Sequence, residues 1–478
     1  MNGEPGELSF LRQVWGELRE DPTSLDRLDP GGYPYLPAEL AAAECAHNAV
    51  AVAALEALIL RAADGPGGEK AGGVQPRVAL NADRLTSAFT SDRHFRVNGE
   101  PPSIWGELSG FWPTADGWVR THANYPHHRL RLLEAAGLPV TAGAAEFRVR
   151  VNSMEALQFE DAVVNAGGVA VAVRTAANWM GSPAGRTAAN GPVLGKRLLG
   201  GGPRISGGGS GAPLAGIRVL DLTRVIAGPV ATRTLAQLGA DVLRVDTPLY
   251  PEHDWQHLDT GQGKRSTVLD LERTADRQRF EDLLGSAHVV VTGYRPCALD
   301  RFGLSPEALC TRRPGIVVGR LSAWGFAGPW AERRGFDSIV QAASGIALLE
   351  SKDGISPGAL PAQVLDHSAG YLLAGGVLAA LRSNREEGGS WLVETSLARI
   401  ASALLALAKS PAEARATSFT PTVETVQTAA GTLSYALLAF QLRTAASGWP
   451  FPSHLWADDT PEWDASPTQP GDAARRPL

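Results

Sequence analysis

Between residues 217 and 322, short apolar segments alternate with amphipathic ones, and this alternation constrains the fold more than any other feature. Runs rich in Val, Ile and Leu have the length of buried strands at 217–222, 240–246, 288–294 and 316–322. Helices are predicted at 229–238 and 304–312. Strands that alternate with helices over short spacings are typical of βαβ units. We therefore expect an α/β fold with a doubly wound parallel sheet, which binds ligands beyond the carboxyl ends of its strands.

A glycine-rich segment divides the chain. Residues 199–213 read LGGGPRISGGGSGAP, and few of these side chains can pack, so the composition predicts a flexible linker. A phosphate-binding loop is disfavoured because no strand pattern precedes the segment and no GK[ST] follows it. We expect an N-terminal segment at 1–198, the linker, a ligand-binding domain at 214–408, and a Pro- and Trp-rich tail at 409–478.

The N-terminal segment has a mixed α and β pattern. Residues 37–62 are strong helix formers with apolar side chains on most faces, which predicts a buried helix. Within 111–137, an Asp-Gly turn is followed by a short strand and a helix. Residues 159–175 predict a helix that ends at Gly167 and Gly168, followed by a strand. This segment is therefore expected to form a smaller α+β unit.

Composition excludes several classes of protein. The 478 residues carry a net charge of −6, which argues against nucleic-acid binding by bulk charge. The 3 cysteines are widely spaced and lack a C-x-x-C pair, so we expect a reducing compartment and no thiolate metal site. The His127-His128 pair is interpreted as a surface feature. The longest apolar stretch, at 369–381, is shorter than the roughly 20 residues of a membrane span. We expect a cytoplasmic protein that binds no membrane.

Basic residues occur in the loops that follow the predicted strands. Any one of them alone is more typical of a solvated surface, but guanidinium and ammonium groups at successive strand ends suit a ligand with several phosphates. These residues are Arg224, Lys264, Arg265, Arg295, Arg301, Arg333 and Arg334.

Asp366 lies just before a long apolar helix. An aspartate at this position is most simply an N-cap, whose carboxylate accepts hydrogen bonds from free backbone N–H groups. A carboxylate that faces a cleft can also be a nucleophile in acyl transfer. The neighbouring His367 is discounted as its partner, because adjacent residues on a helix point in different directions.

Six segments between 213 and 400 resemble, in sequence and in order, the class III CoA-transferase family, also called CaiB/BaiF. The segments are PLAGIRVLDLTRVIAGPVATRTLAQLGADVLRVDTP, GKRSTVLDL, GYRPCALDRFGL, GFAGPWAERRGFDSIVQAASG, the Asp366 segment PAQVLDHSAGYLLAGGVLAAL, and GGSWLVETSL. The resemblance implies a Rossmann-like CoA domain, a second smaller domain and an interlocked homodimer. It also implies that coenzyme A is a substrate and not a permanently bound cofactor.

The resemblance further implies an acyl-CoA:carboxylate CoA-transferase, which moves CoA from an acyl-CoA to a carboxylic acid acceptor through covalent intermediates on an aspartate. Asp366 occupies the position of that catalytic aspartate. Positions where similar proteins contact CoA are occupied by Arg224, Val225, Ala227, Thr247, Tyr294, Arg295, Arg301 and Arg334. We expect the thioester to pass close to the backbone at Gly228, Gly335, Gly345 and Gly370. The aromatic residues expected at the acyl group are Trp324, Phe326 and Trp330.

Two departures from the family pattern bear on function. The segment FWPTADGWVRTHANYPHH at 111–128 resembles one that follows the CoA domain in the family, so the chain has a rearranged order. Related racemases carry a His in a G-H-D stretch, whereas this chain has Gly335-Phe336-Asp337, and Phe cannot transfer a proton. A transferase is therefore favoured. The alternatives are a racemase or another CoA-thioester enzyme of the same fold, and a non-catalytic CoA-binding protein.

Overall fold

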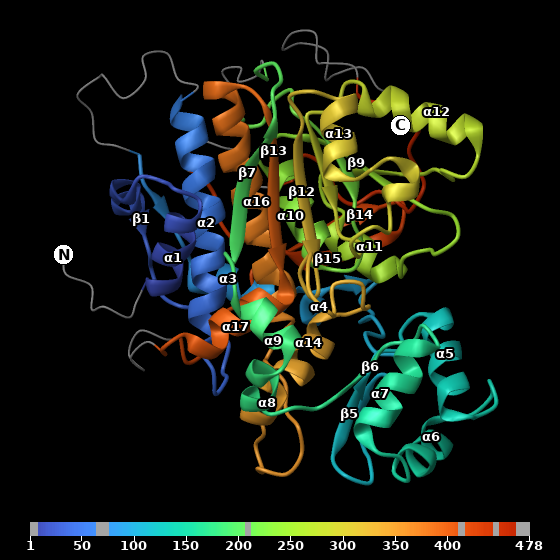
Figure 1. Cartoon of the computed structure of the whole chain (residues 1–478). Helices are drawn as coiled ribbons and strands as arrows, with labels where there is room; N and C mark the ends of the chain where they lie inside the picture. The colour runs from blue at the N-terminus through green and yellow to red at the C-terminus, as the bar shows by residue number, and fades with distance from the viewer. Residues whose placement is uncertain (1–7, 64–75, 206–211, 410–415, 443–448, 465–478) are drawn as a thin grey trace.

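The computed structural model describes residues 8–63, 76–205, 212–409, 416–442 and 449–464 (Figure 1). A seven-stranded sheet forms its centre, with the strand order β10-β9-β8-β11-β12-β13-β7. The six parallel strands are β8 (Arg218–Leu222), β9 (Asp241–Asp246), β10 (Lys264–Val268), β11 (Val289–Thr292), β12 (Val317–Ser322) and β13 (Ser390–Ser396). Counted from β8, this is the order 3-2-1-4-5-6 of doubly wound sheets, and the direction of winding changes between β8 and β11.

Helices cover both faces of the sheet, because successive strand residues point to opposite faces. Val219 and Val289 pack into the core that contains α10 (Ala227–Gln237) and α16 (Val364–Glu387). Their neighbours Leu220 and Val290 pack into the opposite core, together with side chains of α12 (Thr274–Leu284) and α13 (Pro306–Arg312). The strands predicted at 217–222, 240–246, 288–294 and 316–322 are confirmed.

Two long apolar helices pack against each other in the larger core: α2 (Ala42–Ala63) and α16. Both are long and apolar enough to cross a membrane by length and composition, but nearly all of each helix is buried inside the protein. Burial of this kind is typical of the central helices of a folded core. The helix predicted at 37–62 is thus confirmed as a buried helix that begins at Ala42.

The seventh strand comes from the N-terminal segment. Strand β7 (Leu194–Gly200) pairs antiparallel with β13, so the sequence boundary at 198 lies inside a strand of the main sheet. Beyond it, the side-chain amide of Asn384 donates to the Pro203 carbonyl and its oxygen accepts the Ile205 N–H, at 3.2 and 2.7 Å. Residues 199–205 therefore differ from the flexible linker that their glycine content predicts, because backbone contacts replace side-chain packing. Residues 206–211 lie outside the described part of the chain.

A smaller α+β unit lies beyond the carboxyl ends of the parallel strands, at the lower right of Figure 1. Its antiparallel sheet has the order β4-β5-β6, and α5, α6 and α7 pack on it around a separate apolar core. Its elements are β4 (Gly110–Pro113), β5 (Trp118–Thr121), α5 (Pro126–Ala136), α6 (Ala144–Val151), α7 (Ala156–Asn165) and β6 (Ala170–Ala172). The predicted Asp-Gly turn and the helix that ends before Gly167 are confirmed.

The remaining elements are short and connect these layers. They are α1 (Ser9–Glu17), η1 (Pro22–Arg27), β1 (Leu28–Asp29), β2 (Val78–Ala79), α3 (Ala82–Phe89), α4 (Ser91–His94), β3 (Arg96–Val97), α8 (Ala176–Gly181), α9 (Pro183–Ala189), α11 (Asp254–Thr260), η2 (Asp300–Phe302), α14 (Asp337–Ser344), α15 (Ile346–Leu349), α17 (Leu397–Ala406), β14 (Val423–Thr428) and β15 (Gly431–Ala436).

Part of the predicted tail is packed against the main sheet. Strands β14 and β15 form a three-stranded sheet with β3, and residues 449–464 run along the outer strand β10. The Asp459 N–H donates to the Ser266 carbonyl at 2.8 Å, and the Trp456 indole donates to Asp246 at 3.2 Å. An exposed edge strand invites pairing with another chain, and this segment covers it.

Candidate active site

A cavity of about 470 Å³ opens between the carboxyl ends of the parallel strands and the small unit. Its main-sheet wall follows β8, β9, β10 and β11, and its other wall includes Tyr125, His127 and His128 of the small unit. Seven of the eight residues predicted to contact CoA line it. They are Arg224, Val225, Thr247, Tyr294, Arg295, Arg301 and Arg334.

The loop between β8 and α10 provides the inner wall of this cavity. Val225 has a φ of 71°, a left-handed conformation that a β-branched residue rarely adopts. Its N–H donates to Glu252 at 2.8 Å, and this bond holds the strained turn. The eighth predicted residue, Ala227, is the buried first residue of α10 and lies against α16, where its carbonyl faces Gly370. Ala227 is therefore part of the helix contact and does not line the cavity.

A buried ionic network fixes the position of Arg224. Glu252 accepts an ion pair from Arg224 at 3.6 Å and from Arg244 at 3.3 Å. The hydroxyl of Tyr125 also donates to Glu252, and the Arg224 guanidinium lies 5.2 Å from the centre of the Tyr125 ring. Burial alone would raise the pKa of Glu252, but Arg244 and Arg224 lower it to about 2. The network thus ties the small unit to the β8–α10 loop.

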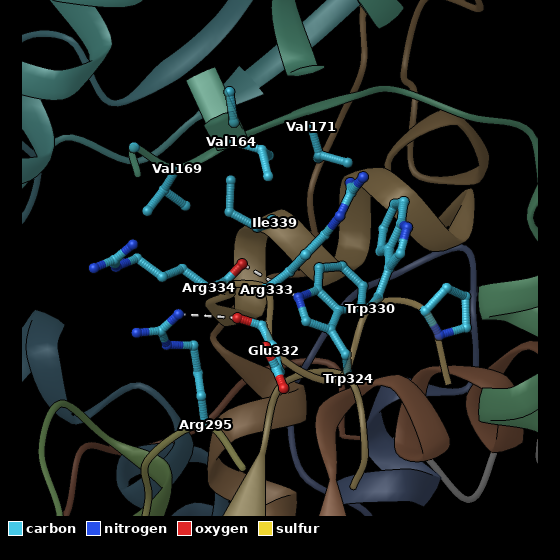
Figure 2. A pocket seen from close by; sticks show the side chains of 13 residues that line it. Val164, Val169, Val171, Arg295, Trp324, Trp330, Glu332, Arg333, Arg334 and Ile339 are labelled. Atoms are coloured by element: carbon cyan, nitrogen blue, oxygen red, sulfur yellow. Dashed lines mark hydrogen bonds between the residues drawn. The ribbon is translucent and has the colours of Figure 1, made fainter. Parts of the chain in front are cut away.

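Arg295 and Arg334 lie on one side of the opening. Arg334 is half-buried, and burial together with the nearby charge of Arg295 lowers its pKa. The Arg295 side chain donates to the Glu332 carbonyl at 3.0 Å, and the Trp324 indole donates to the Arg334 carbonyl at 3.2 Å (Figure 2). Within the described residues, neither guanidinium forms an ion pair with a carboxylate. Two adjacent arginines without a carboxylate partner suit phosphate groups.

The remaining predicted contacts come from the ends of β9 and β11. Thr247 follows β9, where its hydroxyl accepts the Leu249 N–H at 3.3 Å. Burial raises the pKa of Tyr294 to about 12, so its phenol stays neutral. Arg301 is largely exposed and pairs with Glu272 at 3.1 Å, near the mouth of the cavity.

Three other basic residues from the sequence prediction have a different role. Lys264 is buried and pairs with Asp221 at 3.0 Å. Arg265 pairs with Asp241 at 2.6 Å, and Arg333 pairs with Glu160 at 2.7 Å. These three side chains do not line the CoA cavity, and each of them pairs with a carboxylate of the fold instead.

Asp366 is the third residue of α16 and is 7% exposed. The N-cap is Gln363, so the N-cap interpretation of Asp366 is wrong. Asp337, the first residue of α14, accepts the Asp366 backbone N–H at 3.0 Å and caps this helix from outside. Burial first, and then the charge of Asp337, raise the pKa of Asp366 well above its ordinary value. Two carboxyl groups therefore share a buried site.

Consecutive residues connect this carboxyl pair to the cavity. Gly335 and Phe336 line the cavity, and Asp337 follows directly. The Phe336 ring stacks on His122 of the small unit, with 3.7 Å between ring centres and an angle of 6° between the planes. Asp366 itself does not line the cavity; Asp337, which accepts its N–H, is the next residue after the cavity wall.

Comparison with known proteins identifies a family for the region that contains the parallel strands and Asp366. Residues 214–442 match the family described as CoA-transferase family III. This region of the chain is therefore a CoA-transferase family III region.

Individual relatives match over less than half of this chain. An acetyl-coenzyme A transferase of Hypoxylon pulicicidum is 38% identical over 191 residues, which are 39% of this chain and 32% of the relative. The alpha subunit of succinyl-CoA–L-malate CoA-transferase of Chloroflexus aurantiacus is 31% identical over 202 residues, 39% of this chain and 46% of that subunit. The chain thus covers about a third to a half of the length of these relatives.

Among solved structures, a CaiB/BaiF family protein from Brucella suis is 26% identical, with a TM-score of 0.38, over 47% of this chain and 65% of that chain.

The sequence did not assign the residues that the small unit contributes to this site. Tyr125 and His128 line the cavity, and His122 touches Phe336. The interpretation of the His127-His128 pair as a surface feature is wrong for His128, which is 5% exposed. The only signal was the segment 111–128, which the family resemblance had already singled out.

The glycines expected beside the thioester mostly serve packing in the structure. A Cβ on Gly228 would lie 2.3 Å from the Thr223 side chain, and one on Gly345 would lie 2.2 Å from the Ala176 backbone. On Gly370 it would lie 2.6 Å from the Ala227 carbonyl. These glycines allow protein segments to approach each other. Gly335 alone among the four predicted glycines lines the cavity.

Two of the three expected aromatic residues border a cavity, and the third packs elsewhere. Trp324 and Trp330 border a second, smaller cavity of about 170 Å³, which also includes Arg295 and Arg334 (Figure 2). Phe326 packs instead on the Arg320 guanidinium, with 4.1 Å to the ring centre. No group of three or more metal-ligating side chains occurs in the part of the chain that the structure describes.

Proposed function

We propose that this protein is an acyl-CoA:carboxylate CoA-transferase in which Asp366 is the nucleophile. The observation that carries the proposal is the cavity at the carboxyl ends of the strands, whose lining leads through Phe336 to the buried Asp337–Asp366 pair. Family membership supports the same conclusion, since several relatives are named CoA-transferases. The substrates are an acyl-CoA and a carboxylic acid acceptor, and coenzyme A leaves with the product.

We assign CoA to this cavity in a Rossmann-like domain. Arg295 and Arg334 are available for its phosphate groups, and Arg301 lies near the opening. The N-terminal end of α10 adds a positive helix dipole on the inner side. The thioester end then points toward Phe336 and the carboxyl pair.

The reaction proceeds by four acyl exchanges. The Asp366 carboxylate attacks the thioester carbonyl, so that a mixed anhydride forms and the CoA thiolate leaves. The thiolate attacks the Asp366 carbonyl, which gives an aspartyl-CoA thioester and releases the first acid. The acceptor carboxylate attacks this thioester, and the CoA thiolate finally attacks the acceptor carbonyl. Asp366 is regenerated, and each step replaces one leaving group by another.

Epimerisation of an acyl-CoA is the second candidate. A racemase needs two proton-transfer groups at the α-carbon, and Phe336 supplies none. His122 nevertheless lies against Phe336. Burial, and then the neighbouring His128, lower the pKa of His122 well below its ordinary value, so this imidazole is neutral and a weaker base than a free one. Epimerisation predicts deuterium incorporation at the α-carbon in heavy water.

Covalent trapping tests the first proposal. Incubation with acyl-CoA and then hydroxylamine converts an activated Asp366 carbonyl to a hydroxamate, which intact-mass and peptide analysis locates. We expect the adduct in the wild type, its loss in Asp366→Asn, and its retention in Asp161→Asn, a control at an exposed aspartate on α7. Transfer activity that survives Asp366→Asn unchanged would contradict the assignment.

Homodimer assembly remains a prediction of the family resemblance, and a cytoplasmic location remains a prediction of the composition.

A further inference from the structure

Arg120 is a buried cation that, within the described residues, forms no direct ion pair, although the charge of Asp337 acts on it from a greater distance. It is in β5 of the small unit and is 8% exposed. Its guanidinium carbon lies 4.8 Å from the centre of the Trp105 ring and 4.9 Å from that of Phe111. Among the residues that the structure describes, Arg120 forms no ion pair, and its Nε has no hydrogen-bond partner.

A charge in this position is costly. Removal of a guanidinium from water is unfavourable unless carboxylates or hydrogen-bond acceptors replace the solvent. The two aromatic rings and the charge of Asp337 offset only part of this cost, because burial still lowers the pKa of Arg120 to about 10. An anionic ligand that pairs with Arg120 when it binds would offset the remainder.

Arg120 borders a cavity of about 270 Å³ that is separate from the CoA cavity. Polar groups from Ser338, Gln341 and Gln363 line the same space. The hydroxyl of Ser338 is buried and, among the described atoms, also lacks a partner. At about 30 Å³ per water-sized group, the cavity has room for a small organic acid.

The Arg120 cavity is lined by residues next in sequence to the proposed nucleophile and its partner. Gly335 and Phe336 line the CoA cavity and Ser338 lines the Arg120 cavity, so Asp337 lies between them in the chain. Gln363 is the N-cap of the helix in which Asp366 is the third residue. An acid in the second cavity therefore lies next to the start of α16 and the Asp337–Asp366 pair.

We propose that the Arg120 cavity binds a carboxylate that does not react, and that one of the two exchanged acids is therefore a small dicarboxylic acid. This inference rests on the proposed CoA-transferase function. One carboxyl group of such an acid becomes the thioester or attacks the Asp366 carbonyl. The other stays ionised and pairs with Arg120, while the Ser338 hydroxyl and the Gln363 amide provide hydrogen bonds.

The decisive comparison uses two four-carbon acids that differ by one carboxylate: succinate and butyrate. Calorimetry measures the binding of each to the wild type, and an exchange assay measures kcat/KM for each as acceptor. We expect the wild type to prefer succinate, and Arg120→Met to reduce that preference about 10- to 100-fold, the usual range for a lost charge-assisted hydrogen bond. Arg120→Lys, which keeps the charge, should recover part of the preference.

A matched control is Arg148→Met, at an exposed arginine of the same unit that also lies over an aromatic ring, 5.3 Å from the centre of Trp112. It should leave the preference unchanged. Thermal unfolding checks the fold: Arg120→Met should be at least as stable as the wild type without ligand, because an unpaired buried charge is removed. A large loss of stability would show instead that Arg120 supports the structure.

The two proposals can fail separately. If the wild type transfers CoA but prefers butyrate or shows no preference, the dicarboxylate inference is wrong and the transferase function stands. An equal loss for both acids in Arg120→Met also overturns the inference, because it shows that Arg120 acts on the Asp337–Asp366 pair. If no acid accepts CoA while succinate still binds in an Arg120-dependent manner, the proposed function fails and the anion site stands.

Discussion

Replacement of Asp337 by asparagine should move the acid limb of CoA transfer to lower pH. The Asp337 carboxylate accepts backbone N–H groups of Asp366 and Leu365 and the side-chain amide of Gln341. These bonds favour the ionised form of Asp337, although burial raises its pKa to about 6. The negative charge therefore resides on Asp337, and the proton of the pair resides on Asp366. A protonated carboxyl group is a poor nucleophile, so the reaction requires loss of that proton.

The magnitude follows from removal of a nearby like charge. A charge at this range changes the pKa of a carboxyl group by about 1 to 3 units, and one unit corresponds to about 1.4 kcal/mol. Asparagine has nearly the same shape as aspartate, and its carbonyl oxygen can still accept the Asp366 N–H. Burial continues to raise the pKa of Asp366 in the variant. We therefore expect the pH midpoint of kcat/KM to fall by about 1 to 2 units without returning to that of a free carboxyl group.

The assay is the pH profile of kcat/KM, which reports ionisations of the free enzyme. The profile of Asp337→Asn is compared with those of the wild type and of Asp161→Asn, at one acyl-CoA and one acceptor. Affinity for free CoA, measured in parallel, separates a change in ionisation from a displaced cavity wall. An unchanged midpoint would show that Asp366 does not control the acid limb. A higher midpoint would show that Asp337 acts as a base.

Two further variants test the framework of the site. Burial alone would raise the pKa of Glu252, but Arg244 and Arg224 lower it to about 2. The ionised Glu252 carboxylate therefore stabilises the fold above about pH 4.5, and this stabilisation is lost as the pH falls toward 2. Glu252→Gln should cost about 3 to 5 kcal/mol at neutral pH in urea unfolding and should flatten stability over that acid range; an unchanged acid profile would contradict this. A Cβ at Gly370 would lie 2.6 Å from the Ala227 carbonyl, so Gly370→Ala should displace the start of α10, cost about 1 to 3 kcal/mol and weaken CoA binding. Gly181→Ala, with no atom within 4 Å of its Cβ, is the control, and equal behaviour of the two variants would refute the argument.

Strands with an apolar pattern were predictable from the sequence, and strands with polar sequences were not. Strand β10 reads KRSTV, and its first residue is buried only because Asp221 neutralises Lys264. Strand β7 reads LGKRLLG and is an edge strand, so only one neighbour, β13, requires it to be extended. Hydrophobic periodicity cannot detect either case, because the stabilising partner is distant in sequence.

The residues of the candidate site also fall into two groups, those that the sequence predicts and those that only the fold brings together. Residues that follow β8, β9 and β11 converge because the carboxyl ends of parallel strands meet at one edge, and this rule was available from the sequence. Tyr125, His128 and Arg120 belong to a separate folding unit, and only the packing of that unit on the main sheet brings them to the site. No local pattern encodes such packing. Conversely, local pattern alone could not separate Lys264 from Arg334.

Lys264 and Arg334 differ in whether the fold provides a carboxylate that pairs with them. Lys264 is paired at 3.0 Å with Asp221, so its charge is satisfied by the fold. Arg334 and Arg120 form no direct ion pair within the described residues, and they line two cavities whose walls include residues 335, 336 and 338. A cation that the fold neutralises only in part must be neutralised by solvent or by a ligand; the charge of Asp337 acts on Arg120, but burial excludes most of the solvent there. The arrangement thus fits an acyl-CoA that carries negative charge on both sides of its thioester carbonyl. The CoA phosphates lie toward Arg334, and a carboxylate of the acyl group lies toward Arg120.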